Sequence, residues 1–125
     1  MEFHFENDSP VYLQMAKMLE TMVVSGRFPP GSKLPSVREL AMESKTNPNT
    51  VSKALAELER KGLIETRRTA GKFVRESAGM LEESRRQNGE ALCKEFLKAM
   101  ASLGFSPAEI FSQLERMMNH ASDDQ

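Results

Sequence analysis

The chain has 125 residues and is almost neutral, with 17 Lys and Arg residues against 18 Asp and Glu residues. This length fits one domain, or one small domain with a helical appendage. Cys93 is the only cysteine, and His4 and His120 are the only histidines, so the sequence predicts neither an enzyme nor a metal or cofactor site. The longest stretch without a charge, residues 99–108, is too short to span a membrane. No basic segment followed by an apolar one suggests secretion, so we expect a cytoplasmic protein.

The charge is uneven along the chain. Residues 1–76 carry 12 basic and 10 acidic side chains, whereas residues 77–125 carry 5 basic and 8 acidic ones. Within residues 31–75 the balance is 10 basic against 5 acidic. Because attraction to phosphate is screened beyond about 10 Å at ordinary salt, this local excess matters more than the sum over the chain. A basic middle segment is compatible with nucleic-acid binding and also with a solvated surface.

The first predicted helix begins at Ser9-Pro10, with serine as N-cap and proline at the first helical position, and ends at Ser25-Gly26. Phe3 and Phe5 before it indicate either a brief extended segment or an anchor. Two adjacent apolar stripes give the helix a face wider than a small core needs, so we expect it to touch more than its own core. The stripes are Tyr12, Ala16, Leu19 and Val23, and beside them Val11, Met15, Met18 and Met22.

Two short helices are predicted after a proline-rich connection. The first starts at a capping box formed by Ser36 and Glu39 and stops near Ser44, and Lys45-Thr46 forms a turn. The second starts at Asn47-Pro48 and ends at Lys61-Gly62. Their inward-facing residues are expected to be Val37, Leu40 and Ala41 in the first, and Val51, Ala54, Leu55 and Leu58 in the second.

A hairpin and two further helices complete the predicted elements. Residues 63–68 and 71–75 indicate two short strands joined by Thr69-Ala70. Residues 78–102 indicate a helix, Gly104 interrupts it, and a capping box at Ser106 starts the last helix. Neither of these two helices can bury its apolar stripe alone, so we expect them to pack antiparallel on each other and on another surface. The predicted fold is mainly α with one small β-hairpin.

The two short helices and their tight turn are typical of a helix-turn-helix. The second helix would direct its free N–H groups and positive dipole end toward DNA, and short side chains would let it enter a major groove about 12 Å wide. An asparagine such as Asn49 can pair with adenine through its amide. The residues that can contact DNA here are Asn47, Asn49, Thr50, Ser52 and Lys53, although Asn47 can also be a simple N-cap.

Other candidate contacts lie on both sides of this helix. Arg38 can reach a phosphate or a guanine, and the N-cap Ser36 stands beside it. In the hairpin, Gly71 permits a close backbone approach to a minor groove, and the cations around it are Arg67, Arg68 and Lys72. Taken singly, each of these arginines can also be a solvated surface residue.

Four segments of this sequence resemble the GntR family of bacterial winged-helix regulators, and the short tail resembles the YtrA subfamily. The resemblance covers residues 3–74, and its motifs are Pro10-Val-Tyr-Leu-Gln14, Gly26-Arg-Phe-Pro-Pro-Gly-Ser-Lys-Leu-Pro-Ser-Val-Arg-Glu-Leu-Ala41, Asn47-Pro-Asn-Thr-Val51 and Leu58-Glu-Arg-Lys-Gly-Leu-Ile-Glu-Thr-Arg-Arg68. It implies a winged helix-turn-helix that binds an operator with two half-sites as a homodimer. Helix 47–61 would enter the major groove and wing 67–73 the minor groove.

The family pattern also assigns roles to residues, and the sequence departs from it in places. Arg38 matches the arginine of the second helix that contacts DNA, and Gly71 matches the wing tip. Lys45 stands where the family usually has a turn glycine, so either a non-glycine residue takes that geometry or the turn differs. Pro48 and Ser52 stand where some subfamilies have arginines, which implies fewer direct base contacts.

We therefore expect a transcriptional regulator, most simply a repressor, with a DNA-binding domain over residues 1–76 and a dimerisation tail over residues 77–125. A winged helix that docks on a protein is the alternative, but the polar surface over residues 47–53 disfavours it. An unidentified small-molecule effector would bind between subunits or between head and tail, because the tail is expected to offer little pocket volume. The residues expected to dimerise are Met15, Met18, Met22, Leu92, Phe96, Ala99, Leu103, Ile110, Phe111 and Leu114.

Overall fold

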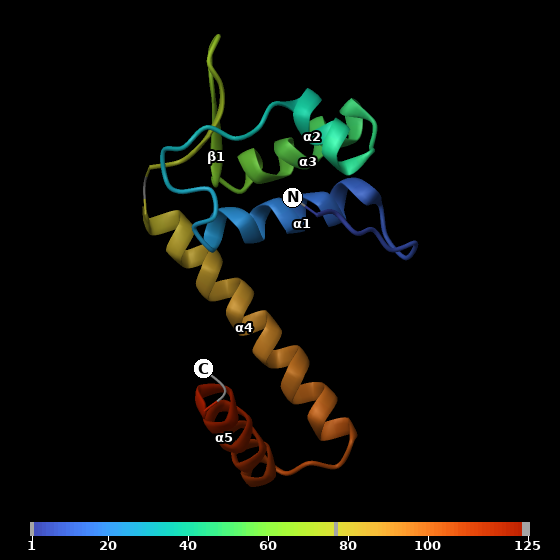
Figure 1. Cartoon of the computed structure of the whole chain (residues 1–125), viewed down its shortest axis with the longest axis vertical. Helices are drawn as coiled ribbons and strands as arrows, with labels where there is room; N and C mark the ends of the chain where they lie inside the picture. Colours follow the sequence, from blue (N-terminus) through green and yellow to red (C-terminus); the bar gives the residue numbers. More distant parts are fainter. Residues whose placement is uncertain (1, 77, 124–125) are drawn as a thin grey trace. The chain divides into compact units, whose positions relative to one another are not determined.

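The computed structural model describes residues 2–76 and 78–123, and the chain divides into two compact units (Figure 1). We call Met1–Arg86 the head and Gln87–Gln125 the tail. Over the described residues the elements follow the predicted order: α1 (Val11–Val24), α2 (Val37–Ser44), α3 (Pro48–Arg60), β1 (Ile64–Arg67), β2 (Gly71–Val74), α4 (Ala78–Ser102) and α5 (Pro107–Asp123). The head extends beyond residue 76 because Leu81, in the first turns of α4, is buried in its core.

The predicted start of the first helix is wrong by one position. Pro10, at ψ 138°, is the N-cap of α1, and no side chain caps this helix end. The Pro10 carbonyl accepts the first backbone hydrogen bonds, from the N–H groups of Leu13 and Gln14. The side-chain amide of Gln14 donates to the Ser9 carbonyl at 2.8 Å, so Ser9 takes part in this helix end through its backbone.

The head core is built around α1 and α3. The predicted inward stripe of α3 is confirmed, since Val51, Ala54, Leu55 and Leu58 are all buried. Phe3 and Phe5 are partly buried against the core with their rings stacked, so the N-terminal segment acts as an anchor. The core contains Met15, Ala16, Leu19, Met22, Val23, Leu34, Leu40, Ala41, Val51, Ala54, Leu55, Leu58, Leu63, Ile64, Val74 and Leu81.

Two methionines of the α1 stripe, Met15 and Met22, lie inside this core. Met15 is fully buried and Met22 is 7% exposed, whereas Met18 is half-buried. The expectation that Met15 and Met22 dimerise is therefore wrong, because side chains already packed inside the head present no surface to a second subunit. Besides α3, the N-terminal segment contacts α1 through hydrogen bonds between Glu6 and Gln14, and Leu81 at the start of α4 lines a pocket with Val23 and Val24.

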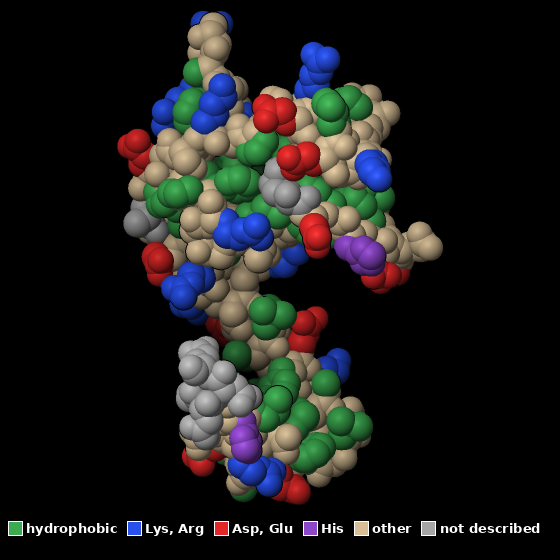
Figure 2. Space-filling model, viewed as in Figure 1, with side chains coloured by type: hydrophobic (Ala, Val, Ile, Leu, Met, Phe, Trp, Pro, Cys, Tyr) green, Lys and Arg blue, Asp and Glu red, His purple; other side chains and the backbone are tan. Residues whose placement is uncertain are grey.

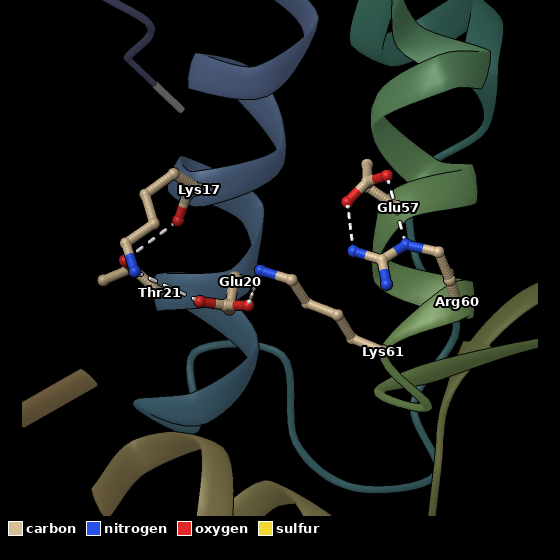
Figure 3. A network of polar contacts seen from close by, with 6 residues as sticks. All are labelled: Lys17, Glu20, Thr21, Glu57, Arg60 and Lys61. Atoms are coloured by element: carbon tan, nitrogen blue, oxygen red, sulfur yellow. Dashed lines mark hydrogen bonds and ion pairs between the residues drawn. The ribbon is translucent and has the colours of Figure 1, made fainter. Parts of the chain in front are cut away.

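A buried carboxylate ties α1 to the end of α3 (Figure 3). Glu20 is only 3% exposed, and its Oε1 accepts a hydrogen bond from Lys61 Nζ at 2.9 Å. Its Oε2 lies 3.3 Å from Lys17 Nζ on the same helix. A buried carboxylate needs such cationic partners, because an uncompensated charge in a core is strongly destabilising. The pair therefore anchors the C-terminal end of α3 against α1.

The hairpin carries a third extended segment that the sequence analysis did not predict. Strands β1 and β2 are antiparallel, with Ile64 opposite Val74 and Arg67 opposite Gly71. Lys33 forms a bridge with Phe73 on the outer side of β2. The Leu34 N–H donates to the Lys72 carbonyl at 2.9 Å, and the Val74 N–H donates to the Ser32 carbonyl at 2.9 Å. The proline-rich connection is therefore tied to the wing by backbone hydrogen bonds.

The tail unit consists of the C-terminal part of α4 and the returning helix α5. The predicted break at Gly104 is confirmed, with φ at +90°, and the predicted capping box is present between Ser106 and Glu109. Among the described apolar residues of the tail, only Ile110 is buried. The large exposed ones are Leu92, Phe96, Leu97, Leu103, Phe111, Leu114, Met117 and Met118.

Candidate nucleic-acid interface

The turn between α2 and α3 is held in one geometry by its own hydrogen bonds. Lys45 adopts the left-handed conformation, with φ 55° and ψ 42°, so a non-glycine residue does take the turn position. The Thr46 N–H donates to the Ala41 carbonyl at 3.1 Å. The Ser44 hydroxyl donates to the Leu40 carbonyl and lies 2.6 Å from the Thr46 hydroxyl. These bonds set the direction in which α3 leaves the turn.

The N-terminal end of α3 presents a short polar surface. Asn47 is the N-cap, and its side-chain oxygen accepts a hydrogen bond from the Asn49 N–H at 2.7 Å. The Asn47 side-chain oxygen is therefore engaged in capping, whereas the exposed Asn49 side chain has no hydrogen bond to the described residues. Ser52 and Lys53 are exposed beside it, and Thr50 is half-buried. Lys53 Nζ lies 5.8 Å from the centre of the Tyr12 ring, a distance at which a cation–π contact forms.

The start of α2 adds one exposed arginine. The Ser36 hydroxyl accepts the Glu39 N–H at 3.1 Å, and Glu39 Oε1 accepts the Ser36 N–H at 3.3 Å, so the predicted capping box is confirmed. Arg38 follows on the exposed side of the helix, with no ion pair or side-chain hydrogen bond to the described residues. In Figure 1, α2 and the tip of the hairpin both lie on the side of the head away from α1.

Two wing cations are already paired inside the hairpin. The Arg67 guanidinium lies 4.1 Å from the centre of the Phe73 ring and 3.2 Å from Glu65 Oε1. Lys72 Nζ donates to the Thr66 hydroxyl at 2.7 Å and lies 3.5 Å from Glu59 Oε2. The Lys72 ammonium, a predicted DNA contact, is half-buried and bridges the wing to α3.

The same contacts lower the pKa of the Glu59 carboxyl. The largest cause is the hydrogen bond that the Thr66 hydroxyl donates to Glu59 Oε1 at 2.7 Å, and the Lys72 ammonium acts in the same direction, while partial burial opposes them. We call Glu59, Thr66 and Lys72 the wing brace. These side-chain contacts link the hairpin to the C-terminal part of α3.

Arg68 and Gly71 occupy the exposed end of the wing. Arg68 lies in the turn between the strands and has no ion pair with the described residues. Thr69 and Gly71 both have positive φ, at 66° and 110°. The hairpin turn therefore depends on one strained threonine and one glycine, and it leaves Arg68 as the arginine of the wing that is free to contact a ligand. Figure 2 shows Lys and Arg side chains gathered around this hairpin.

A groove of about 570 Å³ lies between the wing and the segment before α2. It brings the predicted residues Ser36, Arg68, Gly71 and Lys72 together, and it adds Lys33, which the sequence analysis did not single out. Lys33 did contribute to the basic excess over residues 31–75, but only the strand pairing with Phe73 shows that it lies on the wing.

The tail carries an apolar groove of about 520 Å³ between α4 and α5. Its lining includes the predicted dimerisation residues Phe96, Ile110, Phe111 and Leu114. The expectation of little pocket volume in the tail is therefore wrong: the helices do not close on each other, and the groove is of ligand size. Of the other predicted dimerisation residues, Leu92, Ala99 and Leu103 are exposed.

Two absences hold over residues 2–76 and 78–123. No group of three or more His, Cys, Asp or Glu side chains is arranged to hold a metal ion. No helix combines the length and the apolar character needed to cross a bilayer.

The sequence of this chain is similar to those of known bacterial regulators. The sequence model described as "Bacterial regulatory proteins, gntR family" matches residues 11–74. The transcriptional regulator YhcF of Bacillus subtilis is 36% identical over 92% of this chain and 95% of its own length. The transcriptional repressor YtrA of the same organism is 49% identical over 58% of this chain and 55% of its own length.

Solved structures show the same fold. A GntR family transcriptional regulator from Listeria monocytogenes superposes with a TM-score of 0.83 at 33% identity, over 90% of this chain and 98% of its own. The DNA-binding domain of AraR in complex with operator ORX1 superposes with a TM-score of 0.55 at 25% identity, over 59% of this chain and 95% of its own. The second match identifies a protein of similar architecture that was solved on its operator.

Proposed function

Because the chain belongs to the gntR family of bacterial regulatory proteins, and is a DNA-binding transcriptional regulator and not an enzyme, we propose that it represses a promoter by occupying a two-half-site operator as a homodimer. The main support for this proposal is the surface formed by the polar N-terminal end of α3 and by Arg68 of the wing, which has no ion pair with the described residues. The wing brace holds these two parts together. Two elements linked in this way suit a duplex, where a major groove and a minor groove are adjacent.

Each part of this surface has a role in the proposal. Helix 47–61 lies in the major groove, where Asn49 reads an adenine through its free amide and Ser52 and Lys53 contact bases or phosphates. Wing 67–73 approaches the minor groove, with Arg68 inserted and Gly71 allowing close backbone contact. Arg38 contacts a phosphate or a guanine at the start of α2. These residues belong to a DNA-binding domain over residues 1–76.

In this proposal the segment over residues 77–125, which contains the tail, pairs two copies of the chain. Figure 2 shows hydrophobic side chains gathered on the visible face of the tail. The apolar side chains of the tail include Leu103, which is 74% exposed, and Phe111, which is 70% exposed. A large exposed apolar patch on a small protein marks an interaction surface. We assign the groove lined by Phe96, Ile110 and Leu114 to a second copy of α4 and α5, which would bury the exposed side chains symmetrically.

Dimerisation is needed for operator affinity. One head offers few side chains that can reach base edges, so its binding alone would be weak. Two linked heads share an effective concentration that multiplies affinity without any new contact. Their half-sites should lie about 10–10.5 bp apart, or a multiple of that, from centre to centre. Repression then follows from occupying a promoter, in agreement with the name of the relative YtrA. Such a regulator would act in the cytoplasm, with or without a small-molecule effector.

A gel mobility-shift assay with sedimentation tests this proposal. The full chain is titrated onto a duplex taken from the promoter region of its own gene and onto a random duplex of equal length, at several salt concentrations. We expect dimers at micromolar concentration and a shifted complex that forms at lower protein concentration on the promoter. A monomer with equal affinity for both duplexes would contradict the proposal. In transcription in vitro from the same promoter, an increase on adding the protein would contradict repression.

A further inference from the structure

We propose that Lys33 binds a phosphate of the operator backbone beside the wing, in the groove between the hairpin and residues 33–37. The inference rests on the proposed function and adds to it a contact from outside the helix-turn-helix and the hairpin. The groove lies in the head, and its lining includes Lys33, Ser36, Thr66, Arg68 and Gly71.

The backbone of Lys33 is fixed to the wing. Its bridge with Phe73 is flanked by two hydrogen bonds of 2.9 Å, from the Leu34 N–H to the Lys72 carbonyl and from the Val74 N–H to the Ser32 carbonyl. The Lys33 side chain therefore leaves from an extended segment that is bridged to β2. Because its backbone is fixed beside the hairpin, less entropy is lost when the ammonium binds a phosphate.

The Lys33 side chain crosses the wing at Gly71. A Cβ atom added at Gly71 would lie 3.0 Å from Lys33 Cε and 3.8 Å from Lys33 Nζ. The missing side chain of Gly71 thus leaves the space through which the lysine reaches the end of the hairpin. Its ammonium stands next to the glycine whose backbone is proposed to approach the minor groove, where the phosphates of both strands border the groove.

The cations that line this groove differ in whether they have an acidic partner. Arg67 is paired with Glu65, and Lys72 is paired with Glu59. Lys33 is exposed, and in the part of the chain that the structure describes it has neither an ion pair nor a side-chain hydrogen bond. The described lining of the groove contains four cations, at positions 33, 67, 68 and 72, and no carboxylate. Lys33 and Arg68 therefore carry the unpaired positive charge of the wing.

This combination favours a phosphate over a base. The lysine ammonium is a compact point charge without the planar fork that reads guanine, so it suits a phosphate oxygen. Neutralising one phosphate releases condensed counterions, and each such contact contributes about 0.9 to the slope of log K against log salt on B-DNA. Lys33 should therefore contribute affinity that does not depend on sequence.

The test compares three variants of the full chain by fluorescence anisotropy on operator and random duplexes between roughly 50 and 200 mM salt. K33M removes the charge and keeps the aliphatic stem, K33R keeps the charge, and R27M removes an exposed cation that follows α1. We expect K33M to reduce the magnitude of the slope of log K against log salt by about 0.9 for each bound subunit. It should also reduce the affinity for the operator duplex and for the random duplex by the same factor. K33R and R27M should retain the wild-type slope. Matching thermal unfolding of all variants shows that the head is intact.

The outcomes separate this inference from the proposed function. If wild type prefers the operator but K33M keeps the wild-type slope and affinity, Lys33 does not bind a phosphate and the proposed function stands. If K33M weakens only the operator complex at an unchanged slope, Lys33 reads a base and the inference is overturned. If wild type shows no preference for the operator, the proposed function itself fails.

Discussion

Replacing Lys45 by glycine should stabilise the head, because this lysine has the left-handed conformation with φ 55°. That conformation costs a non-glycine residue about 1–2 kcal/mol. Glycine avoids the cost but loses about 0.5–1 kcal/mol through the greater freedom of the unfolded chain. The net expectation for K45G is a gain of roughly 0.5–1 kcal/mol, which raises the Tm of a domain of this size by about 2–8 °C.

The matched control is the same replacement at Lys53, in the interior of α3. There the lysine is helical, so K53G should lose about 1 kcal/mol and lower the Tm. Thermal unfolding of the full chain, followed by circular dichroism at one fixed protein concentration, measures both variants, since the stability of a dimer depends on concentration. Equal losses of Tm in K45G and K53G would refute the reasoning, because Lys45 would then behave as an ordinary helical residue.

Three further predictions concern the interface, the tail and the wing brace. Asn49→Ala should weaken operator binding by about 1–3 kcal/mol and leave random DNA unchanged in anisotropy titrations, whereas Asn47→Ala should lower Tm through loss of the N-cap, by about 1 kcal/mol. Phe111→Glu should give monomers in sedimentation and leave the unfolding temperature of the head unchanged. A dimer that persists in this variant would show that the tail is not the dimer interface. The pKa of Glu59 is lowered in the folded chain, so the brace contributes stability above the ordinary carboxyl value of 4.5 and loses it as the pH falls through the lower folded value. Urea unfolding of Glu59→Gln should therefore show a deficit relative to wild type at pH 7 that narrows toward pH 3, and a constant deficit would contradict the brace.

The helices and their ends could be predicted because helix caps and apolar spacing depend on residues three or four positions apart. The capping boxes at Ser36 and Ser106, the cap at Asn47 and the break at Gly104 all form as expected. The apolar stripe of α3 is buried as its spacing predicts. The one misplaced boundary, at Pro10, also has a local cause, since the proline stays extended and the helix starts after it.

Candidate DNA-contacting residues could be named from the sequence, but not which of their side chains are free of partners inside the fold. Arg67, Arg68 and Lys72 are equivalent as a pattern, yet only Arg68 lacks a partner among the described residues. The difference arises from Phe73 and Glu59, which reach these cations from the opposite strand and from α3. Charges act through space, so the availability of a cation depends on neighbours that sequence spacing does not reveal.

The sequence by itself determined the order of the elements, the polar end of α3 and the family to which the chain belongs. Only the tertiary structure decided that Met15 and Met22 serve the head core, that Lys33 lies on the wing, and that Lys72 braces the hairpin against α3. The physical reason is that caps and helical periodicity depend on residues close in the chain, whereas burial and ion pairing depend on distant segments that meet only after folding.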